Sequence, residues 1–240
     1  MSAMIPNDPV VIVTGASRGV GRATAKELAN GHGRTVLAIA RDAERLHALQ
    51  AECAQGPGRI EPLALDLAGA SAPIRTREAL AGRRVLGLVN AAGLLIKRDF
   101  GAWTAEDAQR LFHVNAVVPL LLAQALQAEL GGTPPAHIVN IGSMGGFQGS
   151  VKFPGLALYS ASKAAVASLT ECMAEEFKDH GIRCNCLSIG AVDTDMLREA
   201  FPGYQAPISA ASMGAYVARF VLDGHNYFNG KVLPVALSTP

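Results

Sequence analysis

The sequence is short of charged and aromatic side chains. Only 17% of its 240 residues are charged and 5% are aromatic, whereas 50% are hydrophobic. The charged fraction of an average soluble protein is about 25%. So apolar a composition excludes an intrinsically disordered chain, and it indicates that part of the surface is buried against another subunit.

Neither sign of charge is in excess. The 21 Lys and Arg residues oppose 20 Asp and Glu residues, which leaves a formal net charge of +1. A protein that binds the phosphate backbone of nucleic acid, or an anionic lipid surface, usually carries a clear positive excess. We therefore expect neither nucleic acid nor a membrane among the partners.

Several other features are absent. The four cysteines form neither a CxxC pair nor a Cys/His set with zinc spacing, so no metal site is expected. Residues 1–9 are polar and contain proline, unlike a secretory signal. The longest apolar run, 116–123, is far shorter than the about 20 residues that a membrane helix needs. These absences predict a soluble, cytoplasmic protein with reduced thiols.

The chain has no internal repeat, low-complexity segment or linker, and its length suits one α/β domain with a sizeable core. Short apolar, β-branched runs alternate with longer segments of helical periodicity. The runs that we interpret as buried strands are 10–14, 35–40, 60–66, 85–90, 137–143, 183–188 and 231–236. The helical segments lie near 19–30, 42–53, 71–81, 104–130, 158–179 and 209–223.

This alternation predicts a doubly wound, parallel, seven-stranded α/β sheet with right-handed crossovers. In such sheets, ligands bind in the crevice beyond the carboxyl ends of the strands. The residues that carry chemistry in this sequence fall at those ends.

A glycine-rich turn follows the first expected strand. Residues 10–21 read VVIVTGASRGVG, with Gly15, Gly19 and Gly21 between the strand and a helix that begins near residue 19. Glycines allow backbone N–H groups to approach a pyrophosphate at the positive end of a helix dipole. An ordinary βα turn is the alternative. The position after the first strand of a βαβ unit favours a dinucleotide-binding loop.

The TGxxxGxG spacing resembles the cofactor loop of the short-chain dehydrogenase/reductase family. The resemblance implies a Rossmann-type single domain over residues 1–240, with a cofactor half at about 1–143 and a catalytic and substrate part at about 143–240. It also implies a dinucleotide cofactor. The loop residues that would hold it are Gly15, Ser17, Arg18, Gly19, Val20 and Gly21.

The residue after the second strand selects between NAD and NADP. A carboxylate there accepts hydrogen bonds from the ribose 2′-hydroxyl of NAD, whereas a guanidinium binds the 2′-phosphate of NADP. Here the residue is Arg41, and Arg18 approaches from the glycine loop, so we expect NADP (NADPH) rather than NAD. If the strand ran one residue further, Asp42 would take this position and favour NAD. We interpret Asp42 instead as the N-cap of the next helix.

Three further segments resemble cofactor-binding elements of the family. Leu65-Asp66-Leu67 closes the third strand, where a family aspartate accepts from the adenine amino group. NAAG at 90–93 is similar to the family's NNAG motif, and 183–194 resembles the segment that holds the nicotinamide carboxamide. The residues assigned in this way are Asp66, Leu67, Asn90, Ala91, Gly93, Val192 and Thr194. Ile189 stands where the family has proline, which predicts a less constrained loop.

The YSASK sequence at 159–163 carries the expected catalysis. Residues i and i+4 share one face of a helix, which places the Lys163 ammonium near the Tyr159 phenol. A tyrosine pKa is ordinarily about 10, and a fixed cation lowers it. YxxxK is common by chance, but here it follows a strand ending in Ser143. The resemblance implies that Tyr159 is the general acid and Ser143 polarises the carbonyl. It also implies that Tyr159 and Lys163 contact the cofactor, with Lys163 holding its ribose.

Asn115 completes a family-like catalytic tetrad. Pro119, four residues later in the same expected helix, has no N–H, so the Asn115 carbonyl loses its helical partner. In the family, a water at this carbonyl links the lysine to solvent as a proton relay. A kinked helix with a solvated amide side chain is the alternative.

Two loops are expected to set substrate specificity. Compared with the family, 144–158 is longer and 195–208 is shorter, which predicts a comparatively open site for a bulky or tethered substrate. Candidate wall residues, some of which would instead be core or interface residues, are Leu94, Leu95, Phe147, Phe153, Met196, Phe201 and Tyr204.

The apolar helices at 104–130 and 158–179 and the strand at 232–237 match segments through which the family oligomerises, so we expect a homotetramer or homodimer. The predicted function is NADPH-dependent reduction of a small-molecule or carrier-linked ketone to a secondary alcohol. The chain most resembles enzymes of the 3-oxoacyl-carrier-protein reductase and carbonyl reductase types. The alternatives are an NAD-dependent alcohol dehydrogenase and a non-catalytic dinucleotide-binding sensor or scaffold.

Overall fold

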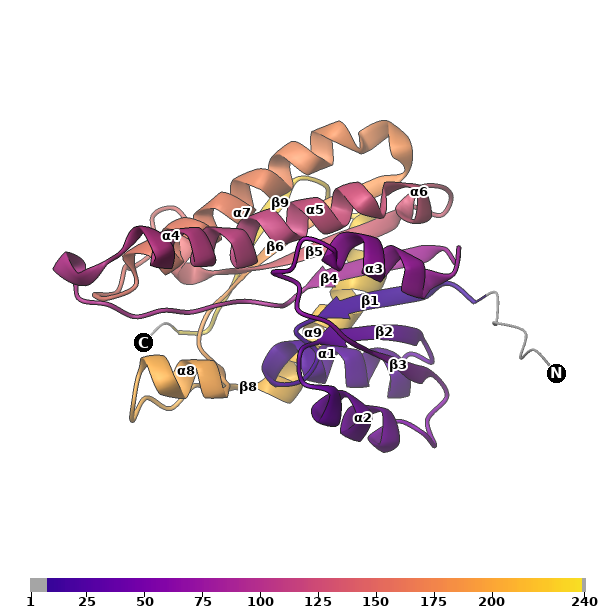
Figure 1. Ribbon diagram of the computed structural model, residues 1–240, viewed down its shortest axis with the longest axis horizontal. Coiled ribbons are helices and arrows are strands. Elements are labelled where there is room, and N and C mark those ends of the chain that lie inside the picture. The colour runs from indigo at the N-terminus through magenta and orange to yellow at the C-terminus, as the bar shows by residue number, and fades with distance from the viewer. Residues whose placement is uncertain (1–7, 239–240) are drawn as a thin grey trace.

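Seven parallel strands form the central sheet of the protein, which a computed structural model describes over residues 8–238 (Figure 1). The strands are β1 (Val10–Thr14), β2 (Thr35–Ala40), β3 (Arg59–Ala64), β4 (Val85–Asn90), β5 (Ala136–Ser143), β6 (Ile182–Ile189) and β9 (Lys231–Val235). Their order across the sheet is β3-β2-β1-β4-β5-β6-β9. This order confirms the predicted doubly wound α/β fold.

Helices cover both faces of the sheet (Figure 1). One layer contains α1 (Gly19–Asn30), α2 (Ala43–Glu52) and α9 (Ala210–Asp223), and the other contains α3 (Ala72–Leu80), α4 (Ala105–Phe112), α5 (Val118–Ala125), α6 (Gln127–Leu130) and α7 (Ala157–Glu176). Strand side chains alternate between the layers: Val11 and Val13 of β1 pack with α1 and α9, and Val10 and Ile12 pack with α5 and α7. This alternation explains why the strands are apolar throughout.

Two predicted elements differ from the structure. The single helix expected at 104–130 is divided into α4, a π-helical segment His113–Val117, α5 and α6. The third strand ends at Ala64, so Asp66 lies in the following turn, where its Oδ1 accepts from the Ala68 N–H at 3.1 Å.

Three short elements were not predicted: β7 (Val192–Asp193), α8 (Asp195–Ala200) and β8 (Ile208–Ser209), with β7 and β8 paired. Within residues 8–238, no helix is both long and apolar enough to cross a membrane. The polar segment expected at 1–9 lies outside the described residues over 1–7. That the whole chain is a single domain stays a prediction.

His137 on β5 is completely buried beneath α9. Asn185 Nδ2 donates to its Nε2 at 2.9 Å, and its Nδ1 lies 3.2 Å from the Val221 carbonyl oxygen. These partners fit a neutral imidazole with the proton on Nδ1. Burial, reinforced by the His225 ring at 5.7 Å, lowers the pKa of His137 from 6.5 to about 3.

Acidification from pH 7 to pH 5 should therefore destabilise the protein through His137. In this range only the unfolded chain binds the proton, because the folded-state pKa is the lower one, so stability falls as the pH drops below about 6.5. At 1.36 kcal/mol per pKa unit, the loss at pH 5 is about 2 kcal/mol. Urea unfolding at both pH values measures it.

The variant His137→Gln should lose about 2 kcal/mol less than the parent over the same pH interval. The exposed His47 provides the matched control, and His47→Gln should keep the parent's pH dependence. An unchanged pH dependence in the His137 variant would contradict the proposed coupling.

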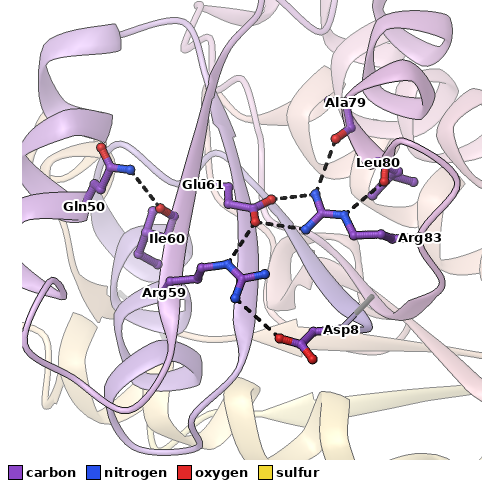
Figure 2. A network of polar contacts seen from close by, with 8 residues as sticks. All are labelled: Asp8, Gln50, Arg59, Ile60, Glu61, Ala79, Leu80 and Arg83. Atoms are coloured by element: carbon purple, nitrogen blue, oxygen red, sulfur yellow. Dashed lines mark hydrogen bonds and ion pairs between the residues drawn. The ribbon is translucent and has the colours of Figure 1, made fainter. Parts of the chain in front are cut away.

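Glu61 on the edge strand β3 is the centre of an ionic network at the amino ends of the strands (Figure 2). Arg83 donates to both carboxylate oxygens, at 2.9 and 2.6 Å, and Arg59 Nε donates at 3.1 Å. Arg59 also pairs with Asp8 at 3.4 Å. The Arg83 side chain is only 6% exposed. Burial raises the pKa of Glu61, but hydrogen bonds from both arginines outweigh it and hold the pKa below its usual value.

We expect Glu61→Ala to lower the free energy of unfolding by about 3 kcal/mol, because it leaves the buried Arg83 guanidinium without its anion. Urea denaturation at pH 7 measures this loss. The control is Glu52→Ala, which removes a more exposed carboxylate paired with Arg22 and Lys26 and should cost below about 1 kcal/mol. Equal losses in the two variants would show that burial of Arg83 adds nothing.

Candidate functional site

A cavity of about 510 Å³ lies at the carboxyl ends of the parallel strands, where the topology predicts a ligand site. It is lined by the segments that follow β1 to β6, by α8 and by the start of α7. The predicted site residues that line it are Gly15, Ser17, Arg18, Gly19, Val20, Gly21, Arg41, Asp66, Leu67, Ala91, Gly93, Ser143, Tyr159, Lys163, Val192 and Thr194. Asn90 and Asn115 lie behind its wall.

The glycine loop is packed so closely that side chains would not fit. A Cβ on Gly15, which has a φ of 67°, would lie 2.8 Å from the backbone of Ala92. A Cβ on Gly21 would lie 2.5 Å from the Gly15 carbonyl oxygen. The N-cap of α1 is Arg18, whose side chain caps no N–H group. The start of α1 therefore offers backbone donors to an anion in the cavity.

The two candidate residues after β2 have separate roles. Arg41 lines the cavity. Asp42 is the N-cap of α2, where its Oδ1 accepts from the Arg45 N–H at 3.0 Å, and it pairs with the Arg45 guanidinium at 3.3 Å. The strand therefore ends where the sequence predicts, and Asp42 does not face the cavity.

Arg18 on the other side of the cavity has anionic neighbours on α8. Its Nη1 lies 4.0 Å from Asp195 and 3.9 Å from Glu199, and the three side chains are 49% to 72% exposed. At such distances and exposure each ion pair contributes little, so the Arg18 guanidinium is weakly held.

Asn90 binds inside the sheet rather than in the cavity. Its Nδ2 donates to Asn140 Oδ1 at 2.8 Å, and Asn140 Nδ2 donates to Thr170 Oγ1 at 2.9 Å. This buried chain joins β4, β5 and α7. The side chain of Asn90 therefore positions the segment that follows β4, whose Ala91 and Gly93 do line the cavity.

Ser143 and Tyr159 present hydroxyl groups at the same part of the cavity. The Ser143 Oγ accepts from the Gly145 N–H at 3.1 Å. Burial of the phenol raises the pKa of Tyr159, and the facing Ser143 hydroxyl acts in the opposite direction but is the weaker influence. Tyr159 is therefore protonated at neutral pH. The sequence predicts the opposite shift, caused by the Lys163 cation.

That cation, Lys163, is buried, and its Nζ donates to the Ile141 carbonyl at 2.7 Å. Burial lowers the pKa of Lys163 to about 8, which leaves most of it protonated at pH 7. A Cβ on Gly93 would lie 3.6 Å from this ammonium group. Lys163 therefore places a positive charge at the cavity wall beside Gly93.

Asn115 holds together the segments around this cluster. It sits in the π-helical segment, which the missing N–H of Pro119 helps to explain. Its amide pairs with the Leu94 backbone in both directions, at 2.8 and 2.9 Å, and its Nδ2 donates to Ser162 Oγ at 2.9 Å. Ser162 in turn donates to the Tyr159 carbonyl at 2.7 Å. The water relay through Asn115 stays a prediction.

Ile141 and Ser162 are site residues that sequence reasoning missed. Ile141 acts through its backbone carbonyl, which leaves no mark on residue type. Ser162 carried a usable signal, because it lies three residues after Tyr159 and so near the same helix face.

The loop after β6 is better held than the missing proline predicts. Gly190 N–H donates to Val235 O at 2.9 Å, and Ala191 N–H donates to Ser238 O at 3.2 Å. Thr194, the N-cap of α8, accepts from the Leu197 N–H at 3.3 Å. The carboxyl-terminal segment thus fixes the loop in place of the proline.

The candidate wall residues divide into two groups. Those that line the cavity are Leu94, Leu95, Phe153, Met196 and Phe201. Phe147 does not line it, and neither does Tyr204, whose hydroxyl lies 2.9 Å from Ser238 Oγ. Over residues 8–238, no group of three or more His, Cys, Asp or Glu side chains is placed to hold a metal ion.

Comparison with known proteins identifies a family and several relatives that this chain resembles. A family model described as short chain dehydrogenase matches residues 9–205. Protein FixR of Bradyrhizobium diazoefficiens is 35% identical and covers 94% of this chain and 84% of its own. Carbonyl reductase (NADPH) 2 of Sus scrofa is 37% identical, and the match covers 78% of this chain and 73% of the reductase. The crystal structure of a short chain dehydrogenase of Burkholderia cenocepacia in complex with NADP is 30% identical, covers 96% of both chains and has a TM-score of 0.82.

Proposed function

The chain belongs to the short-chain dehydrogenase/reductase family of oxidoreductases that act on carbonyl and alcohol substrates, and from this premise we propose that it is an NADPH-dependent ketone reductase. The observation that carries the proposal is the meeting of the glycine loop, Arg41 and the Ser143–Tyr159–Lys163 cluster around one cavity.

A nicotinamide dinucleotide fits the residues of this cavity. The tight packing at Gly15 and Gly21 brings the backbone close to the space at the start of α1, whose N–H groups suit a pyrophosphate. Arg41, together with Arg18, would bind a 2′-phosphate. The names of one relative and one solved structure include NADPH and NADP, which agrees with this choice. When bound, the cofactor supplies the hydride that reduces the ketone carbon.

The protein's own residues bind the substrate oxygen and donate a proton to it. Ser143 accepts from Gly145, which leaves its hydroxyl proton to donate to the substrate oxygen. Tyr159 gives its proton to that oxygen as the carbonyl becomes an alcohol. Lys163 supplies a cation that stabilises the phenolate left behind and that would hold the cofactor ribose. Asn115 binds the Leu94 backbone and the Ser162 hydroxyl, and so fixes the segment after β4 relative to the start of α7.

The alternatives have less support. Oxidation by an NAD-dependent alcohol dehydrogenase would need Tyr159 as a base, whereas burial raises the pKa of this phenol. Such an enzyme would also be expected to have a carboxylate at the position of Arg41. A non-catalytic dinucleotide sensor would have no use for the Tyr159 and Ser143 hydroxyls.

Absorbance at the nicotinamide band, followed with a ketone panel, tests the proposal. We expect a kcat/KM for NADPH at least about tenfold above that for NADH, because a charge-assisted contact to the 2′-phosphate contributes at least about 1.5 kcal/mol. Binding of both cofactors without any ketone reduction would favour the sensor. Faster turnover with NADH would favour the NAD-dependent enzyme.

We further propose a cytoplasmic homotetramer, or else a homodimer. Val117 and Leu121, next to and within α5, are each 37% exposed although apolar, which suits burial by a second copy. Cys53, Cys172, Cys184 and Cys186 are all free thiols, which suits a reducing compartment.

A further inference from the structure

The end of the cavity next to Tyr159 has an apolar wall. The wall side chains come from the segment after β4, from the loop before α7 and from α8 and the residue that follows it. They are Leu94, Leu95, Phe153, Leu156, Met196 and Phe201. The Phe153 and Phe201 rings meet edge to face with centroids 5.3 Å apart. Hydroxyl groups at this end belong to Ser143 and Tyr159, which the reaction itself would use.

Most charged side chains of the cavity follow β1 to β3, lie on α4 or are engaged. Arg110 lies on α4 one turn before His113, and the Lys163 ammonium, which the reaction itself would use, donates to the Ile141 carbonyl. Arg18, Arg41 and Asp66 follow β1, β2 and β3, and His113 contacts the Ala68 carbonyl at 3.1 Å on the same side. Asp195 accepts from Arg198 at 2.6 Å. The apolar end therefore has little to offer to a hydroxylated or anionic substituent.

Lys97 shows how the apolar wall is held. Its Nζ donates to the Ala200 carbonyl at 2.8 Å and lies 5.3 Å from the centre of the Phe201 ring. Its charge thus binds the last carbonyl group of α8 and lies near an aromatic ring, both of which attract cations. Arg98, the next residue, donates from its N–H to the Gly155 carbonyl at 3.0 Å. Lys97 and Arg98 join the three wall segments.

We propose that the substrate is a ketone with an apolar substituent, preferably an aromatic ring, rather than a polyhydroxylated ketose. This inference rests on the proposed ketone reduction. Each hydroxyl of a ketose would lose its water at this wall without gaining a protein partner, and an unpaired buried polar group is costly. An aromatic ring would bury apolar surface and pack edge to face with Phe153 or Phe201. Lys97 is a positioning residue for Phe201.

The first test compares 4-phenylbutan-2-one with a ketopentose under saturating NADPH. We expect kcat/KM to be at least about tenfold higher for the phenyl ketone. A ketopentose that is reduced as well or better overturns the inferred substrate class but supports ketone reduction. Butan-2-one serves as a small reference ketone. If the enzyme reduces none of the three ketones, both the proposed function and this inference are overturned.

The second test changes the wall. In Phe201→Ala, the ratio of kcat/KM for 4-phenylbutan-2-one to that for butan-2-one should fall about tenfold, mainly through KM. Phe201→Leu keeps an apolar side chain at this position, so it serves as a second test if Phe201→Ala does not fold. It should lower the ratio less. Lys97→Met should lower the same ratio through KM, and Lys97→Arg, which keeps the charge, should keep the ratio near that of the parent. Phe100→Ala, at a side chain 86% exposed, is the matched control. An unchanged ratio in both Phe201 variants contradicts the inference.

Discussion

Replacing Tyr159 by phenylalanine should lower kcat for ketone reduction by about a thousandfold, since general acid catalysis typically contributes about 10²–10⁴. The substitution keeps the ring and removes only the hydroxyl that would protonate the substrate oxygen. Because burial raises the pKa of this phenol, the parent enzyme holds the proton at neutral pH. Steady-state rates with NADPH measure the loss. The Kd for NADPH, from fluorescence titration, should stay within about threefold of the parent.

Tyr204→Phe is the matched control for this substitution. Its hydroxyl contacts Ser238 and does not line the cavity, so kcat should change less than about twofold. Retention of more than about a tenth of the parent kcat in Tyr159→Phe would show that another group donates the proton.

Much of the fold could be predicted from the sequence because buried parallel strands and amphipathic helices leave strong local patterns. The run at 10–14 is apolar at every position because neighbouring residues face opposite helical layers, as Val11 and Ile12 do. Asp42 was correctly interpreted as an N-cap because that role depends on local backbone hydrogen bonding alone.

The π-helical segment was beyond such patterns. Pro119 indicates that one helical hydrogen bond is missing, but not how the backbone compensates. The structure compensates with a wider turn, in which the Val118 N–H donates to the His113 carbonyl. That turn directs Asn115 toward Leu94 and Ser162, contacts that depend on tertiary packing rather than on any local spacing.

The cavity residues were predicted unevenly for a similar reason. Side chains at strand ends, such as Ser143 and Arg41, follow from topology, since parallel strands end at one edge of the sheet. The pKa of Tyr159 did not follow, because burial of the phenol raises it, and burial depends on tertiary packing rather than on the YxxxK spacing. Phe147 and Tyr204 were wrong as wall residues, since a loop sequence does not determine which aromatic side chain turns inward.

Removing the Arg41 guanidinium should raise the Kd for NADPH by about 10- to 150-fold, the equivalent of one charge-assisted hydrogen bond of about 1.5–3 kcal/mol. Arg41 lines the cavity and has no ion pair within the described part of the chain. The Kd for NADH, which lacks the 2′-phosphate, should change less than about threefold. Fluorescence titration of Arg41→Ala with both cofactors measures the difference.

Arg18→Ala should likewise raise the Kd for NADPH, because the weak ion pairs of Arg18 with Asp195 and Glu199, near 4 Å, leave its guanidinium able to bind the same phosphate. The double variant should fall short of the product of the single effects, since both arginines would bind one phosphate. Arg45→Ala removes the same charge from an exposed position paired with Asp42 and should leave both Kd values unchanged. If Arg41→Ala weakened NADPH and NADH equally, Arg41 would act on the shape of the cavity and not on the 2′-phosphate.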